Sequence, residues 1–207
     1  MLGFYNYTVI MTYIGTLFGI SGIACAVNGN IHSALLCLMA AGFCDMFDGK
    51  IASTMKRTVQ EKRFGIQIDS LSDLICFGVL PALILLSTSA SSAIIFIIAA
   101  VYALSALIRL AWFNVDEEER QNCSDGQREY YYGLPVTTAA LFLPVIIGIG
   151  ELRDWWLAPL AAVTLAAMSI AFLTPFRIKK PHLPGKVGVL LCGCGELAIL
   201  LMGVVRL

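Results

Sequence analysis

Four aspartates fall within a short stretch of the chain, at spacings that would bring their carboxylates together. Asp45 and Asp48 stand three residues apart, and Asp69 and Asp73 stand four apart. On a helix, either separation places both side chains of a pair on one face. Oxygen ligands suit hard divalent cations, so two such pairs that meet across a helical hairpin would form a magnesium, manganese or calcium site.

The segments that carry these aspartates are strongly apolar. The chain has 207 residues, of which 58% are apolar and 14% charged, whereas a soluble domain carries roughly 25% charged residues. Seven apolar runs approach the roughly 20 residues that a spanning helix needs. They cover residues 8–27, 31–52, 66–87, 92–113, 134–150, 155–173 and 187–205, and the short fifth run has an alternative start at Tyr130–Tyr132. We expect an all-α fold, with one domain over residues 1–207 that forms a polytopic transmembrane bundle of about six to seven spanning helices.

The connections between the runs differ in charge. Lysines and arginines gather between the second and third, the fourth and fifth, and the sixth and seventh runs. The opposite connections, which are Gly29-Asn30, Ser87–Ser92 and Glu151–Asp154, have Arg153 as their single basic residue. The excess of positive charge on cytoplasmic loops predicts that the first set, and the aspartates beside it, face the cytoplasm. The formal net charge of zero gives no indication of a nucleic-acid partner.

Small residues recur in register with the aspartates. Gly49 follows Asp48 directly, Ala52 stands one turn later, and Gly65 precedes Asp69 by four residues. Ionised carboxylates at membrane depth are costly and repel one another, so they need a compensating cation. Glycine beside them lets a ligand approach the backbone, although helix packing alone also favours glycine in membrane helices.

These residues together resemble the signature of the CDP-alcohol phosphatidyltransferase family. The matching pattern is Asp45-x2-Asp48-Gly49-x2-Ala52, followed by Gly65-x3-Asp69-x3-Asp73. The resemblance implies an enzyme that displaces CMP from a CDP-linked lipid with an alcohol, and that uses two divalent ions, Mg²⁺ or Mn²⁺. It implies that the first three aspartates are metal ligands, and that Asp73 contacts metal and acts as the general base. The CDP-lipid contacts that it implies are Asp45, Gly49, Ala52 and Gly65. A homodimer is implied by the resemblance alone.

Two features depart from the family pattern. Ser53 stands where the family usually has arginine, and the loop from there to Gly65 is longer than usual. A longer surface loop costs little free energy. The missing arginine would be expected to support the nucleotide phosphates or a ligand carboxylate. Lys56 or Arg57, one turn further on, would supply the positive charge instead.

Further segments resemble the phosphatidylserine synthase branch of that family, and the similarity covers about residues 8–180. They are Phe64 to Pro81, Arg109-Leu110-Ala111-x-Phe113-Asn114 and Gly133-Leu134-Pro135. This branch implies CDP-diacylglycerol and L-serine as substrates. Arg109 lies in an apolar run and needs an anionic partner, which the serine carboxylate or a lipid phosphate would provide. A snorkelling or structural role is the alternative for Arg109; Asn114, at the same helix end, is a second candidate acceptor contact.

Two other functions are compatible with these residues. Glycerol phosphate or inositol phosphate as the acceptor would use the same aspartates, but would call for more basic residues around it. A cation-coupled membrane transporter would instead use the carboxylates as an ion pathway. Transport favours carboxylates near the bilayer midplane and interrupted helices, whereas these aspartates lie near helix ends beside matched glycines, which favours catalysis.

Overall fold

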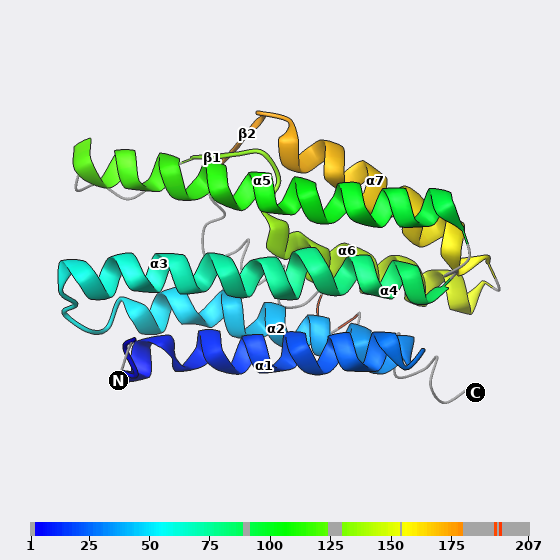
Figure 1. The fold of residues 1–207 in the computed structure, drawn as a ribbon, viewed down its shortest axis with the longest axis horizontal. Coiled ribbons are helices and arrows are strands. Elements are labelled where there is room, and N and C mark those ends of the chain that lie inside the picture. Colours follow the sequence, from blue (N-terminus) through cyan, green and yellow to red (C-terminus); the bar gives the residue numbers. More distant parts are fainter. Residues whose placement is uncertain are drawn as a thin grey trace.

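A computed structural model of the chain forms a bundle of long helices that pack side by side along one axis (Figure 1). The structure describes residues 3–88, 92–123, 130–153 and 155–179, together with Gly193 and Gly195. The helices are α1 (Tyr7–Val27), α2 (Ile31–Ala52), α3 (Val59–Asp73), the π-helical η1 (Leu74–Val79), α4 (Leu80–Thr88), α5 (Ala93–Cys123), the 3₁₀-helical η2 (Val136–Thr138), α6 (Ala139–Leu152) and α7 (Leu157–Leu173). Two short strands, β1 (Tyr130–Tyr132) and β2 (Arg177–Lys179), pair antiparallel.

The described helices fit a membrane protein. By length and composition, four are suited to cross a membrane: Tyr7–Val27, Ile31–Ala52, Val59–Thr88 and Ala93–Glu119. Val136–Leu152 and Leu157–Leu173 are shorter apolar helices. The expected all-α transmembrane bundle is confirmed, with the β1–β2 pair as an addition. Apart from Gly193 and Gly195, the expected run 187–205 lies outside the described residues.

The third helix begins at Val59, well before the apolar run expected at residue 66. Its start is fixed by a capping box: the Glu61 backbone N–H donates to Thr58 Oγ1 at 3.2 Å, and the Thr58 N–H donates to Glu61 Oε2 at 2.7 Å. These bonds satisfy backbone donors that a helix end otherwise leaves open. As a result, one helix carries the polar first turns and both Asp69 and Asp73.

The alternative start of the fifth run at Tyr130–Tyr132 is wrong, because these residues form β1, in which Tyr131 pairs with Ile178 of β2. Gly133 follows with φ +74°, a backbone conformation that favours glycine. A Cβ at Gly133 would lie 3.1 Å from the carbonyl oxygens of Phe172 and Thr174. This close crossing turns the chain before α6 begins.

Glycines on one face of α1 let it pack closely against its neighbours. Gly15, Gly19 and Gly22 are all buried on this face. A Cβ at Gly22 would lie 2.7 Å from Leu80 Cδ2 and 2.9 Å from Cys37 Cβ. In membranes, small residues allow helices to approach closely enough for backbone and side chains to interlock. Helix α1 therefore contacts both α2 and α4.

Replacement of Gly22 by valine should destabilise the bundle, because the new side chain would overlap Leu80 and Cys37. Overpacking of this kind costs about 1–3 kcal/mol. Thermal unfolding of the purified chain in detergent should show a lower midpoint for Gly22→Val. The neighbouring Ser21 is exposed on the same helix, so Ser21→Val is the matched control. Equal midpoints for the two variants would contradict this packing.

Candidate functional site

The two aspartate pairs come from adjacent helices. Asp45 and Asp48 lie in the last turns of α2, which ends at Ala52. Asp69 and Asp73 lie in the last turns of α3, which continues without a break into η1 and α4. The short connection between α2 and α3 makes the two helices antiparallel neighbours, so the two polar helix faces meet.

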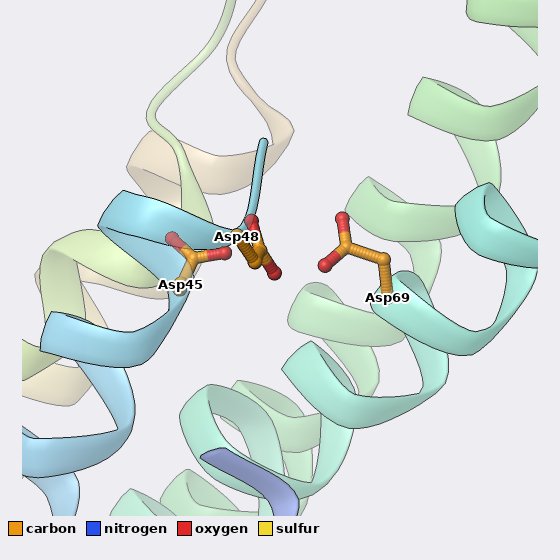
Figure 2. Close-up of side chains that lie close together, drawn as sticks. All are labelled: Asp45, Asp48 and Asp69. Atoms are coloured by element: carbon orange, nitrogen blue, oxygen red, sulfur yellow. The ribbon is translucent and has the colours of Figure 1, made fainter. Parts of the chain in front are cut away.

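The carboxylates converge as the spacing predicts. In Figure 2, Asp45 and Asp48 on α2 face Asp69 on α3 across a narrow gap. One carboxylate oxygen from each of these three residues lies within 4.8 Å of the other two. Asp73 lines the same small cavity of about 10 Å³ as the other three aspartates. A cavity of this size has room for about one water-sized sphere, and thus for an ion rather than an organic group.

Helix α1 supplies the Thr12 hydroxyl group to the same cavity. The Thr12 side chain is buried, lines the cavity and donates a hydrogen bond from Oγ1 to Asp48 Oδ2 at 3.3 Å. One turn later, Thr16 Oγ1 lies 2.7 Å from Ser72 Oγ on α3. These bonds join α1 to both helices of the aspartate hairpin. Thr12 thereby helps to orient the Asp48 carboxylate, which also has hydrogen bonds to the Asp69 side chain and the Gly49 backbone.

The donor set fits a hard divalent cation. The four carboxylates and the Thr12 hydroxyl line the cavity together. All five groups offer oxygen atoms, the ligands that Mg²⁺ and Mn²⁺ prefer. The ion pairs of His32 with Glu151 and of Arg63 with Glu118 include none of the four aspartates. Because clustered carboxylates repel one another, a bound cation is the natural compensation here.

The small residues of the motif differ in their surroundings. No atom lies within 4 Å of the position that a Cβ would take at Gly49, so its backbone borders open space. At Gly65 the nearest atom is Nη1 of Arg57, at 3.1 Å. Glycine at this position thus makes room for the guanidinium of Arg57, one turn of α3 before Asp69. Lys56, by contrast, is exposed.

Ser53, in the position where the family usually has arginine, turns away from the aspartates. Its Oγ donates a hydrogen bond to the Lys50 carbonyl at 2.7 Å, back onto the end of α2. The half-buried Arg57, rather than Ser53 or Lys56, is therefore the basic or polar group that the loop brings against α3.

Comparison with known proteins agrees with this site. The CDP-alcohol phosphatidyltransferase family profile matches residues 5–177, most of the chain, including both aspartate pairs. The chain belongs to this family.

Several relatives in this family have curated names. A CDP-diacylglycerol–serine O-phosphatidyltransferase of Mycobacterium leprae is 27% identical over 181 residues, which are 83% of this chain and 57% of the relative. The protein of the same name from Bacillus subtilis is 26% identical over 86% of this chain and 91% of its own length. An archaetidylserine synthase of Methanothermobacter thermautotrophicus is 27% identical over 85% of this chain and 70% of its own length. The chain thus spans less than two thirds of the mycobacterial relative's length.

The two candidate acceptor residues lie in different surroundings. Asn114 on α5 reaches α3, where its Oδ1 accepts a hydrogen bond from Ser70 Oγ at 2.7 Å, directly beside Asp69. Arg109 is buried, lies 5.8 Å from the centre of the Phe113 ring, and lines a second cavity of about 450 Å³ between α5 and the end of α7. That cavity shares no lining residue with the aspartate cavity. Asn114 is thus joined to the helix that carries Asp69.

Replacement of Thr12 by valine should weaken metal binding while the fold persists, since it removes the hydroxyl that orients Asp48. Loss of a group that orients a metal ligand typically costs about 10- to 100-fold in affinity. Titration with Mn²⁺, followed by electron paramagnetic resonance, measures this directly. Thr164→Val on α7 is the control, because Thr164 bonds only to Leu160 of its own helix. Unchanged Mn²⁺ affinity in Thr12→Val would exclude this role.

Proposed function

We propose that the chain transfers the phosphatidyl group of CDP-diacylglycerol to L-serine, with phosphatidylserine and CMP as products. The observation that carries this proposal is the convergence of four carboxylates from the family signature on one ion-sized cavity. Membership of the family supports CMP as the leaving group, and the curated names of the relatives support serine as the acceptor. The proposed enzyme is a homodimer whose site faces the cytoplasm, on the side of the basic α2–α3 loop.

Each aspartate has a proposed role. Asp45, Asp48 and Asp69 bind two Mg²⁺ or Mn²⁺ ions together with Asp73, and the bound ions would neutralise charge on the pyrophosphate. Asp73 also accepts the proton of the serine hydroxyl while the serine oxygen forms a bond to the lipid-side phosphorus. The bond from that phosphorus to the CMP oxygen breaks, and the electron pair leaves with CMP.

The remaining motif residues hold the substrates. Gly49 and Ala52, at the end of α2, let the nucleotide approach the backbone, and the open space at Gly49 supports this role. Arg57 supports the phosphates from its position against Gly65, with Lys56 as a weaker contributor. Asn114 is the acceptor contact with the stronger support, because it is joined to Ser70 beside Asp69. Arg109 is the second proposed acceptor contact, through the serine carboxylate.

A transporter fits the geometry less well. Asp48 lies four residues from the end of α2, and α3 runs without a break through η1 into α4. Asp45 and Asp48 near the end of α2 suit a substrate that enters from the membrane surface, whereas transport sites lie near the midplane on interrupted helices.

The test is CMP release by the purified chain from CDP-diacylglycerol and Mn²⁺, with serine, glycerol phosphate or inositol phosphate offered separately. The proposal requires CMP release that depends on serine. Release that depends on another acceptor would keep the family chemistry and overturn serine as the substrate. No release with any acceptor would overturn the transferase and favour transport.

Replacement of Asp73 by asparagine should abolish turnover but preserve CDP-diacylglycerol binding, because it removes the proton acceptor and leaves three carboxylates. Loss of a general base typically lowers the rate about 10²- to 10⁴-fold. The measurement is kcat for CMP release, beside the CDP-diacylglycerol affinity of the same sample. Glu118→Gln, which neutralises an exposed carboxylate, is the control. Weakened binding with retained turnover would contradict the assignment.

Arg57→Ala should raise the KM for CDP-diacylglycerol more than Lys56→Ala does. The reason is that Arg57 lies against Gly65 on the helix of Asp69, whereas Lys56 is exposed to solvent. Hydrogen bonds to a charged partner contribute about 1.5–3 kcal/mol, so an increase of about tenfold or more is expected for Arg57→Ala. Steady-state kinetics with varied CDP-diacylglycerol distinguish the two; equal effects would remove the special role of Arg57.

A further inference from the structure

The helix that carries Asp69 and Asp73 changes its winding immediately after Asp73. Residues Leu74–Val79 are π-helical, and at its end the Leu80 N–H bonds to the carbonyl of Ile75, five residues back. Single π-helical turns inside α-helices are rare and occur frequently at functional sites. Phe77, in the middle of this turn, lines the cavity of the four aspartates. The geometry of the turn therefore affects the site directly.

The sequence explains why the winding changes here. In an α-helix the carbonyl of Phe77 would accept a hydrogen bond from the N–H of residue 81, but residue 81 is proline. Proline has no N–H, and its ring clashes with the carbonyl four residues earlier. The wider π turn relieves the clash, but it leaves the Phe77 carbonyl without its usual donor, in a part of the bundle where Phe77 is 1% exposed.

A side chain from another helix supplies the missing donor. Tyr102 on α5 is fully buried, and its hydroxyl donates to the Phe77 carbonyl at 2.7 Å. The Tyr102 ring packs against Phe172 of α7, with ring centroids 5.6 Å apart. The position of the hydroxyl is thus fixed by the packing of α5 against α7, so it acts as a rigid anchor for the turn.

We propose that Tyr102 is a positioning residue for the aspartate site: its hydroxyl takes the place of the N–H that Pro81 lacks and holds the π turn that directs Asp73. The inference rests on the proposed role of the aspartates as metal ligands. Tyr102 is not among the described residues that line the aspartate cavity. It acts through the backbone of Phe77, four residues along the same helix from Asp73.

The test is a double-mutant cycle on the full purified chain, because Pro81→Ala restores a backbone N–H that can reach the Phe77 carbonyl. Mn²⁺ affinity, measured by electron paramagnetic resonance without CDP-diacylglycerol, is the first readout. Tyr102→Phe should weaken it by about tenfold, as for other groups that orient metal ligands. In the Pro81→Ala background, Tyr102→Phe should lower the Mn²⁺ affinity much less. The effects of two substitutions that share one hydrogen-bond partner are not additive.

The second readout is CMP release. Tyr102→Phe should lower kcat and leave the KM for CDP-diacylglycerol within about twofold, since a displaced Asp73 affects a group that acts in the transition state. Ser105→Ala is the matched control. It removes another buried hydroxyl of α5, one turn away, which donates to the carbonyl of Val101 on its own helix, and it should leave both readouts unchanged.

Unchanged Mn²⁺ affinity in Tyr102→Phe, or an equal loss in both backgrounds, would overturn the proposal. If Tyr102→Phe does not fold, the double variant decides: it must fold and bind Mn²⁺ as Pro81→Ala does, and a double variant that still fails contradicts the role of the hydroxyl. A wild-type chain that binds Mn²⁺ but releases no CMP would overturn the proposed function and leave this inference standing on the metal readout.

Discussion

Like-charged carboxylates held close together are the constraint on which the arrangement of α1, α2 and α3 depends. Two unit charges at the 4.8 Å limit that contains Asp45, Asp48 and Asp69 repel by about 3 kcal/mol at an effective dielectric of about 20. Several such pairs carry a cost in free energy that a cation bound between them would offset. A divalent ion removes this repulsion, and the same ion is what phosphoryl-group chemistry requires. In the proposed function, the stability of the hairpin and its reactivity would thus have a common physical origin.

The rest of the bundle holds the carboxylates in place against this repulsion. The glycine face of α1 brings that helix close to α2 and α4, which carries Thr12 to within hydrogen-bonding distance of Asp48. On the opposite side, α5 contributes Tyr102 to the π turn that follows Asp73. The Thr12 and Tyr102 hydroxyls would find no alternative partner in lipid, so the loss of either hydrogen bond would be costly. Packing far from the site therefore fixes the directions of its ligands.

Much of the site follows from local sequence, because it depends on helical periodicity. The spacing of the aspartate pairs predicted their convergence, and the glycines in register predicted the family that the comparison found. The start of α3 was placed too late because the apolar run was used as the boundary, although Thr58 and Glu61 carry a capping-box signal. The strand at Tyr130–Tyr132 depends on pairing with residues 177–179, which no local pattern indicates.

Contacts between distant segments were beyond the sequence. Thr12 bonds to a residue 36 positions away, and Tyr102 to one 25 positions away; spacing within one helix says nothing about either. Two features of the sequence could have indicated these contacts. One is a polar side chain inside an apolar run, and the other is Pro81 inside an expected helix. Arg109 and Asn114 were both candidate acceptor contacts, because both lie near the end of the expected apolar run 92–113, whereas α5 continues to Cys123. They point in different directions, since five residues on a helix correspond to about 140° of rotation.

The most direct test of this account is the number and affinity of Mn²⁺ ions bound by the purified chain, before and after Asp45 and Asp69 are both replaced by asparagine. These two residues come from different helices, so neither helix alone can compensate for their loss. The account predicts saturable Mn²⁺ binding in the wild-type chain that disappears in the double variant, while the helical content is retained. Saturable binding that survives the double replacement, or none in the wild-type chain, would contradict the metal site.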